Sequence, residues 1–206
     1  PKGITYSPEI LDIKRTSEAV SCAVRKDGGD DPDVTSGALI YAQVSLKEIR
    51  ESGGCFVEAD GGVGVGRVTK PGLDQPVGAA AINHVPREMI EKEVREVANL
   101  ADFSGTISVI VSVPEGEKIA EKTFNPRLGI IGGISIIGTT GIVEPMSSQA
   151  LLDTIRLELN QRRALGFDYV AITPGNYGRD FMKEAWNYDI ERSVKCSNFI
   201  GQTIDM

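Results

Sequence analysis

The sequence predicts a mixed α/β and α+β protein, in which an N-terminal α+β domain with hairpins and helices precedes a parallel βαβ domain of α/β type. The first half alternates strand-like segments with polar turns, a pattern typical of hairpins. The second half follows the order strand, loop, helix, strand, loop, helix, which is typical of parallel sheets. Because the pattern changes near Gly132 and Gly133, we expect one domain over residues 1–132 and another over residues 133–206.

A hairpin with a long loop is predicted close to the N-terminus. Residues 19–25 and 38–46 are strand-like, and the polar segment between them carries Asp27, Asp30, Asp31 and Asp33. Carboxylates this close together can hold a divalent cation, although their spacing differs from that of an EF-hand loop. Aspartate is also common in turns, where it accepts hydrogen bonds from its own backbone. We favour the turn and expect no protein-bound metal.

The next predicted strand, residues 55–59, leads into a glycine-rich segment over residues 60–70. Gly61 and Gly66 have the spacing of a phosphate-binding loop, but Arg67 and Val68 stand where that loop requires lysine and then serine or threonine. A dinucleotide fingerprint also fails, because the third glycine is not at the required distance. A flexible segment remains, whose Arg67 either meets a carboxylate-bearing ligand or forms a surface ion pair.

A packing helix and a buried strand complete the first half. Pro86 suits the start of a helix whose apolar face is formed by Ile90, Val94, Val97 and Ala101. Residues 106–113 alternate as a strand does, and residues 115–124 resemble a short helix. His84, the single histidine, precedes the first helix. Since the sequence nominates no nucleophile and no orienting acid for it, we interpret His84 as structural.

Residues 125–145, NPRLGIIGGISIIGTTGIVEP, alternate short aliphatic runs with glycines. We expect a buried strand over residues 134–137 that feeds a loop of small residues. Ligands of parallel sheets sit where loops leave the carboxyl ends of strands, so this loop supplies candidate binding residues: Gly138, Thr139, Thr140 and Gly141. The alternative, which stays open here, is a tight turn within a core.

Two helices and one more strand follow. A helix over residues 148–165 is predicted to bury Leu151, Leu152, Ile155 and Leu159 and to end at Gly166. A strand over residues 169–172, a loop over 173–178 and a helix through Trp186 complete the pattern. Because right-handed crossovers make consecutive strands parallel, we expect this loop and the one at residue 138 to share an edge of the sheet and a ligand.

Composition excludes several classes of function. Lysine and arginine total 22 against 29 acidic residues, a net charge of −7, and no basic run is present, so we expect no nucleic-acid partner. Cys22, Cys55 and Cys196 are widely spaced and odd in number, which disfavours disulfides and a zinc site and fits a cytoplasmic location. With no long apolar stretch and no leader-like segment, we expect no membrane association. Oligomeric state is left open.

The sequence closely resembles the CbiD family, the carbon-1 methyltransferases of cobalt-precorrin-5B in anaerobic cobalamin synthesis. The motifs that carry the resemblance span residues 24–37, 61–73, 76–90, 125–147, 174–181 and 195–201, and include VRKDGGDDPDVTSG, GGVGVGRVTKPGL and PGNYGRDF. The resemblance implies S-adenosylmethionine (SAM) as methyl donor and a ring-contracted cobalt corrinoid as acceptor. Since that substrate brings its own cobalt, it calls for no protein metal ligands.

The family pattern also extends beyond both ends of this sequence, with a segment rich in glycine, threonine and cysteine before it and an apolar strand with a His-Ile-Gly-Lys loop after it. We therefore expect an internal portion, incomplete at the C-terminal end of its second domain, with weakened or abolished turnover.

The resemblance directs the assignment of binding residues. For SAM we expect one set from each loop: Gly138, Thr139, Thr140, Gly141 and Glu144, then Gly175, Asn176 and Tyr177. For the carboxylates of the corrinoid, which we expect to meet the first domain, we choose four cations: Lys26, Arg67, Lys70 and Arg127. Methyl transfer is an in-line displacement in which orientation supplies about 7 to 11 kcal/mol, so no catalytic base is assigned. Two other functions stay open: a non-catalytic nucleotide- or corrinoid-binding module, and a small-molecule kinase.

Overall fold

The computed structural model describes residues 6–29, 33–49, 53–138 and 148–206. The chain divides into two compact units, one formed by residues 1–69 and 74–143 and the other by residues 70–73 and 144–206. This division falls later than the boundary that we expected near Gly132 and Gly133, because the short strands around those glycines pair within the first unit. No helix in the described part of the chain is both long enough and apolar enough to cross a membrane.

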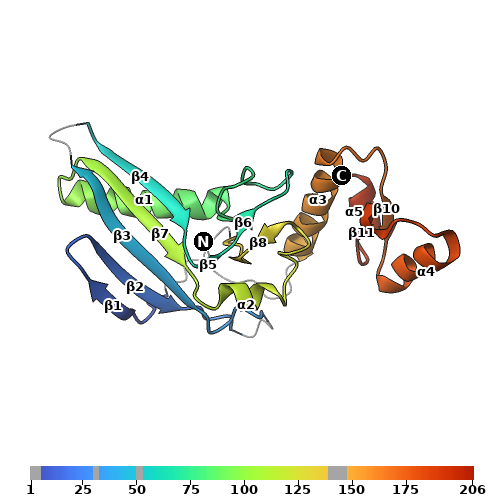
Figure 1. Cartoon of the computed structure of the whole chain (residues 1–206), viewed down its shortest axis with the longest axis horizontal. Coiled ribbons are helices and arrows are strands. Elements are labelled where there is room, and N and C mark those ends of the chain that lie inside the picture. The colour runs from blue at the N-terminus through green and yellow to red at the C-terminus, as the bar shows by residue number, and fades with distance from the viewer. Residues whose placement is uncertain (1–5, 30–32, 50–52, 139–147) are drawn as a thin grey trace. The chain divides into compact units, whose positions relative to one another are not determined.

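The first unit is built on a five-stranded sheet in the order β1, β2, β3, β7, β4 (Figure 1). Its strands, in chain order, are β1 (Leu11–Arg15), β2 (Ala19–Arg25), β3 (Leu39–Ile49), β4 (Cys55–Gly61) and β7 (Gly105–Ser112). β2 and β3 pair antiparallel, with Val20 opposite Val44, which confirms the predicted hairpin. β4 and β7 run parallel and are joined through a helix.

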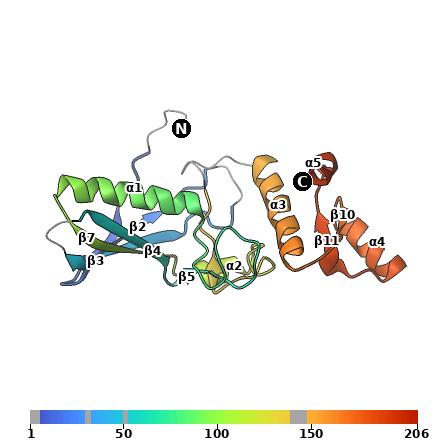
Figure 2. The same cartoon turned by 90° about the horizontal axis from the view of Figure 1, so that it is seen from above.

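That helix, α1 (His84–Leu100), lies along one face of the sheet (Figure 2). Ile90, Val94 and Ala98 form an i, i+4 row that packs against a buried cluster of Cys55, Ile107 and Val109. The predicted apolar face is wrong at Val97, which is 66% exposed because the next residue, Ala98, occupies the inward position. It is also wrong at Ala101, which is exposed and follows the end of the helix. Hydrophobic periodicity therefore located the helix but misplaced its inner edge by one residue.

The glycine-rich segments of the first unit form four very short strands and a one-turn helix: β5 (Gly64–Val65), β6 (Arg67–Val68), α2 (Gly116–Ala120), β8 (Ile130–Ile131) and β9 (Gly133–Ile134). β5 pairs parallel with β9, and β6 pairs antiparallel with β8. A Cβ atom on Gly64 would lie 1.7 Å from the carbonyl oxygen of Val113, so this backbone approach requires glycine. The choice that the sequence left open at Gly138 to Gly141 is not decided by this packing, because residues 139–141 lie outside the described residues.

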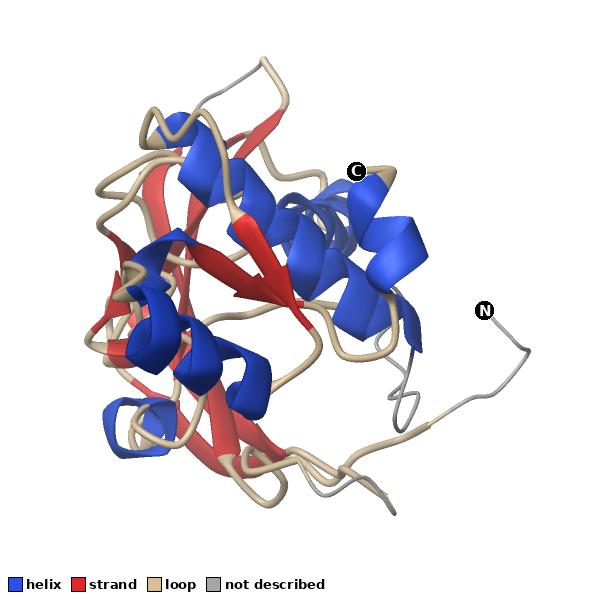
Figure 3. Ribbon diagram, turned by 90° about the vertical axis from the view of Figure 1, so that its right-hand side faces the viewer, coloured by secondary structure: helices blue, strands red, loops and turns tan. Residues whose placement is uncertain are grey.

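The second unit contains a parallel βαβ motif, although its two strands are not the pair that the sequence predicts. β10 (Ala171–Thr173) and β11 (Ser193–Lys195) pair in parallel and are connected through α4 (Asn176–Trp186) and the 3₁₀ turn η1 (Ile190–Arg192), with α3 (Ser148–Ala164) before and α5 (Ile200–Ile204) after them (Figure 3). The mixed α/β class is thereby confirmed. The predicted partner of the 169–172 strand is wrong, because β9 pairs with β5 and β10 with β11, in separate sheets.

The long helix of this unit ends where the sequence predicts. Gly166 has a φ of +81°, and the backbone N–H groups of Gly166 and Phe167 donate to the carbonyls of Arg163 and Arg162 at 3.0 Å each. Ile155 is buried against Val194 and Cys196. Leu151, expected to be buried, is about half exposed, so the inward face of α3 is narrower than its leucine pattern indicates.

Candidate functional site

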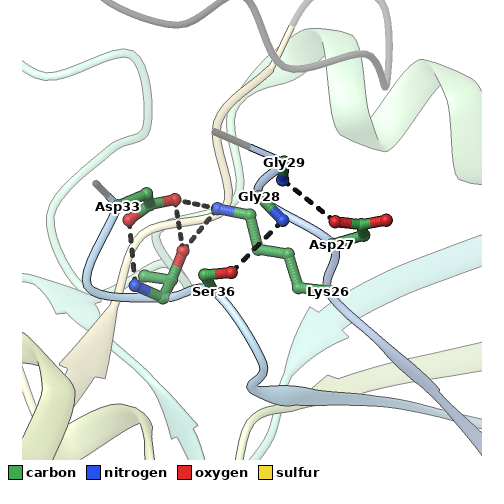
Figure 4. A network of polar contacts seen from close by, with 7 residues as sticks. Lys26, Asp27, Gly28, Gly29, Asp33 and Ser36 are labelled. Carbon is green, nitrogen blue, oxygen red and sulfur yellow. Dashed lines mark hydrogen bonds and ion pairs between the residues drawn. The ribbon is translucent and has the colours of Figure 1, made fainter. Parts of the chain in front are cut away.

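Lys26 lies in the loop between β2 and β3, within a network of polar contacts (Figure 4). Its ammonium donates to the carboxylate of Asp33 and to the hydroxyl of Thr35. Asp33 also accepts hydrogen bonds from the Thr35 hydroxyl at 2.6 Å and the Thr35 backbone N–H at 2.9 Å. Burial alone would raise the pKa of Asp33, but these hydrogen bonds outweigh it and hold the pKa below its usual value. The charge of Lys26 thus helps to hold the loop together.

Asp27 and Asp33, the two aspartates of this loop that the structure describes, accept hydrogen bonds from other residues of the loop. Asp27 accepts the backbone N–H of Gly29 at 2.9 Å, and Ser36 accepts that of Gly28 at 3.3 Å (Figure 4). Asp30 and Asp31 lie outside the described residues. Among the residues described, no group of three or more histidine, cysteine or acidic side chains is arranged to hold a metal ion.

Arg67 is paired with Asp60 at the end of β4. Its Nη1 and Nη2 atoms donate to the two carboxylate oxygens at 2.8 and 3.0 Å, and Nη2 also donates to the carbonyl of Gly61 at 2.8 Å. The hydrogen bonds from Arg67 lower the pKa of Asp60 despite its partial burial, so this carboxyl stays ionised. Both side chains are nearly half exposed. A ligand carboxylate that approached Arg67 would compete with Asp60.

Arg87, which the sequence did not nominate, connects three segments of the first unit. From the first turns of α1 its guanidinium donates to the carbonyls of Ile82 at 2.9 Å and Ala80 at 3.3 Å, and to that of Ala59 in β4. One planar guanidinium thus donates to three backbone carbonyls, of which that of Ala80 also accepts the backbone N–H of Ile82 at 2.7 Å. Arg87 therefore holds the start of α1 against the end of β4, next to Asp60.

Asp74 lies ten residues before His84 and contacts it twice. One carboxylate oxygen accepts the backbone N–H of His84 at 2.6 Å, and Nδ1 of the imidazole lies 3.0 Å from the other. The side chain of Asn83, at the N-cap position, makes no capping hydrogen bond within the described part of the chain, so Asp74 caps α1 from a distance. The acid that the sequence did not nominate for His84 is therefore present.

In the second unit, the loop from β10 to α4 brings together residues from both strands of the motif. Nζ of Lys195 donates to Oδ1 of Asn176 at 3.1 Å. Lys195 stands opposite Thr173 in the parallel register, so both side chains lie on the same face of the sheet, toward the first turn of α4. Thr173 is 2% exposed, and its hydroxyl has no hydrogen-bond partner among the described residues.

Comparison with known proteins identifies the family of this chain. The CbiD family model matches residues 1–145. The chain belongs to the CbiD family. This confirms the resemblance that the motifs indicate.

Relatives of this CbiD-family chain include the "Cobalt-precorrin-5B C(1)-methyltransferase" of Ruminiclostridium cellulolyticum, which is 52% identical over 100% of the chain and 52% of that protein. The protein of the same name from Alkaliphilus metalliredigens is 47% identical over the same shares. A crystal structure of the cobalamin biosynthesis protein CbiD from Archaeoglobus fulgidus is 28% identical and covers 89% of this chain and 56% of its own, with a TM-score of 0.45. The chain spans about half the length of the curated relatives it matches.

The remaining residues predicted for the site lie in several places. Gly138 is exposed, with a φ of +151°, four residues after β9, whereas Thr139, Thr140, Gly141 and Glu144 lie outside the described residues. Gly175 is the N-cap of α4, and Tyr177 is 94% exposed in its first turn. Arg127 is exposed between α2 and β8, and Lys70 is exposed within the 70–73 segment of the second unit.

Sequence reasoning missed three residues of these clusters: Asp74, Arg87 and Lys195. Each acts through a contact with a residue of another segment, and none belongs to a short pattern with its partner. Arg87 and Lys195 lie inside the family motifs, and that position was the signal that could have found them. Asp74 lies between two motifs and had no such signal.

Proposed function

We propose that this chain takes part in the SAM-dependent methylation of carbon 1 of cobalt-precorrin-5B, in anaerobic cobalamin synthesis. The observation that carries this proposal is the match along the entire chain to relatives named for that reaction, at up to 52% identity. The family model supports it over residues 1–145.

Methyl transfer depends mainly on how its two substrates are bound and oriented, and the described residues offer binding groups for that purpose. Bound SAM supplies an electrophilic methyl group, and the acceptor carbon attacks it in line as the sulfonium loses its charge. Orientation of the two substrates contributes about 7 to 11 kcal/mol, so binding surfaces matter more than a strong base. We accordingly assign binding roles and no catalytic base.

We place the SAM site at the start of α4, in the βαβ motif. Loops at the carboxyl ends of parallel strands are where ligands of such sheets bind. Lys195 and the backbone N–H groups of the first turn of α4 attract the carboxylate of SAM, and Gly175 leaves room for it. The exposed ring of Tyr177 offers a surface on which adenine can stack. Gly138, Thr139, Thr140, Gly141 and Glu144 stay a separate prediction for SAM binding, made from the sequence alone.

For the corrinoid, the cations of the first unit differ in how well they suit the role. Arg67 is half exposed and its partner Asp60 is also exposed, so a substrate carboxylate can replace Asp60 at little cost. Lys26 is committed to Asp33 and Thr35 and is the poorer candidate. Arg127 stays a predicted contributor in this unit, and Lys70, which belongs to the second unit, stays a separate prediction.

Calorimetry with SAM and with ATP tests the proposal. We expect SAM to bind and ATP not to bind, and Lys195→Met to weaken SAM binding about tenfold, the loss of roughly 1.4 kcal/mol. Lys183→Met is the matched control, since Lys183 carries the same charge but lies in the last turn of α4, at the end away from the proposed site. ATP binding without SAM binding would favour a kinase, and corrinoid binding without either nucleotide would favour a binding module. Equal SAM affinity in Lys195→Met and the parent would remove the site assignment.

A further inference from the structure

The imidazole of His84 is oriented by its contact with Asp74. Nδ1 lies 3.0 and 3.1 Å from the two carboxylate oxygens, while the side chain of His84 is 67% exposed. Because an ionised carboxylate can only accept hydrogen bonds, the ring donates from Nδ1. In the neutral ring this leaves the lone pair on Nε2, on the edge away from Asp74.

Asp74 is itself held in place, which makes it a rigid support. Its Oδ2 accepts the backbone N–H of His84 at 2.6 Å and the side-chain amide of Gln75 at 2.9 Å. These two donors and the ring Nδ1 of His84 hold the carboxylate in place, and the carboxylate directs the ring.

The ring contact is separate from the capping of α1. The cap uses the backbone N–H of residue 84, which any residue other than proline would supply. An oriented imidazole whose outer nitrogen makes no hydrogen bond to the described residues is the arrangement of metal-binding histidines, whose other ring N–H almost always donates to a carboxylate, carbonyl or water. His84 is also the single histidine of the chain.

The metal in question is supplied by the substrate. A cobalt ion held by the four nitrogens of a tetrapyrrole has two axial positions, above and below the ring, and imidazole is a common protein ligand for such metals. We propose that Nε2 of His84 binds the cobalt of the corrinoid substrate in an axial position, replacing a water molecule. This inference rests on the proposed function, and it assigns His84 as the residue that anchors the macrocycle to the start of α1.

Electron paramagnetic resonance tests the assignment. The probe is reduced cobyrinic acid, a Co(II) corrinoid with free carboxylates and no nucleotide base, added to the chain prepared without a histidine tag. One axial nitrogen-14 splits each high-field cobalt line into three, whereas axial water leaves the lines unsplit. In protein labelled with [¹⁵N]histidine we expect two lines in place of three. Because the chain has one histidine, this change identifies His84 as the ligand.

Variants separate the ring from the cap. His84→Gln keeps the backbone cap and is expected to bind the corrinoid without splitting, and added imidazole restores the splitting in His84→Ala. Asp74→Asn is expected to weaken corrinoid binding 10- to 100-fold, the range seen when such supporting residues are changed. Gln75→Ala, which leaves the contact between Asp74 and the ring in place, keeps the splitting.

The outcomes distinguish this inference from the proposed function. A corrinoid that binds the parent chain without nitrogen splitting, or one that keeps the splitting in His84→Gln, overturns the axial role of His84 and leaves the corrinoid proposal standing. Failure of the corrinoid to bind at all overturns both.

Discussion

The carbonyl oxygen of Gly64 lies 2.1 Å from the position that a Cβ atom on Gly133 would occupy. Two family motifs, far apart in the sequence, thus meet backbone to backbone where β5 pairs with β9. Gly64 and Gly133 are therefore required by close backbone packing, although their segments resemble ligand-binding loops in the sequence.

Gly133→Ala is expected to destabilise the chain by about 3 kcal/mol, because the methyl group must displace backbone rather than a flexible side chain. Gly132→Ala is the comparison: its φ is +81° and nothing lies within 4 Å of the added methyl, so a cost of about 1 kcal/mol is expected from backbone strain alone. Urea unfolding measures both. Equal losses at the two positions would contradict the packing explanation.

Thr173→Val is expected to stabilise the chain by about 1 kcal/mol, because it removes a buried hydroxyl that has no partner in the described part of the chain. The matched control is Thr203→Val. Thr203 is equally buried, but its hydroxyl donates to the carbonyl of Phe199 at 2.7 Å, so a loss of about 1 kcal/mol is expected there. Thermal unfolding of the two variants should shift in opposite directions, and a lower unfolding temperature for Thr173→Val would show that Thr173 does have a partner.

Lys26→Met is expected to lower the free energy of unfolding near neutral pH by about 1 kcal/mol. The pKa of Asp33 is lower in the folded chain than in the unfolded one, so its contribution is complete above the unfolded pKa of about 3.9 and is lost as the pH falls through the folded pKa. Lys26→Met should therefore show a shallower loss of stability below about pH 4. Lys47→Met, which breaks the exposed pair with Glu58, is the control and should change little.

Arg67→Met is expected to weaken the binding of cobyrinic acid about tenfold, and Arg67→Lys somewhat less, because lysine keeps the charge but not the planar fork. Asp60→Asn should strengthen binding, since it removes the carboxylate with which the ligand competes. The differences should shrink as salt is added. Isothermal titration at two ionic strengths measures these affinities, and tighter binding by Arg67→Met than by the parent would argue against the role.

Elements with a strong local pattern could be predicted from the sequence. β2 occupies Ala19–Arg25 as expected, and Gly166 caps α3 at positive φ. Period-two alternation, turn residues and the terminal glycine of a helix are each set by the nearest residues in the chain. Errors arose where the pattern is short: the strand expected at residues 134–137 is limited to Gly133–Ile134.

Candidate site residues followed the same rule. Lys26 and Arg67 were found through their motifs, but their partners Asp33 and Asp60 were not assigned to them. A long basic side chain can reach any of several acidic residues nearby, and only the folded loop decides which one it contacts. Asp74 lies in a loop, where no periodic pattern predicts which residues meet, so the sequence could not link it to His84. Their contact decides which nitrogen of the ring faces away from Asp74.

The amino-acid sequence by itself determined the mixed class, the order of the longer elements and the family, because these depend on local periodicity and on long motifs. Only the tertiary structure decided that β9 joins β5 rather than β10, that Asp74 orients His84 and that Lys195 reaches Asn176. The physical reason is that two-residue strands and loop side chains have little preference of their own. Their partners are set by which backbones can approach closely, and that depends on the whole fold.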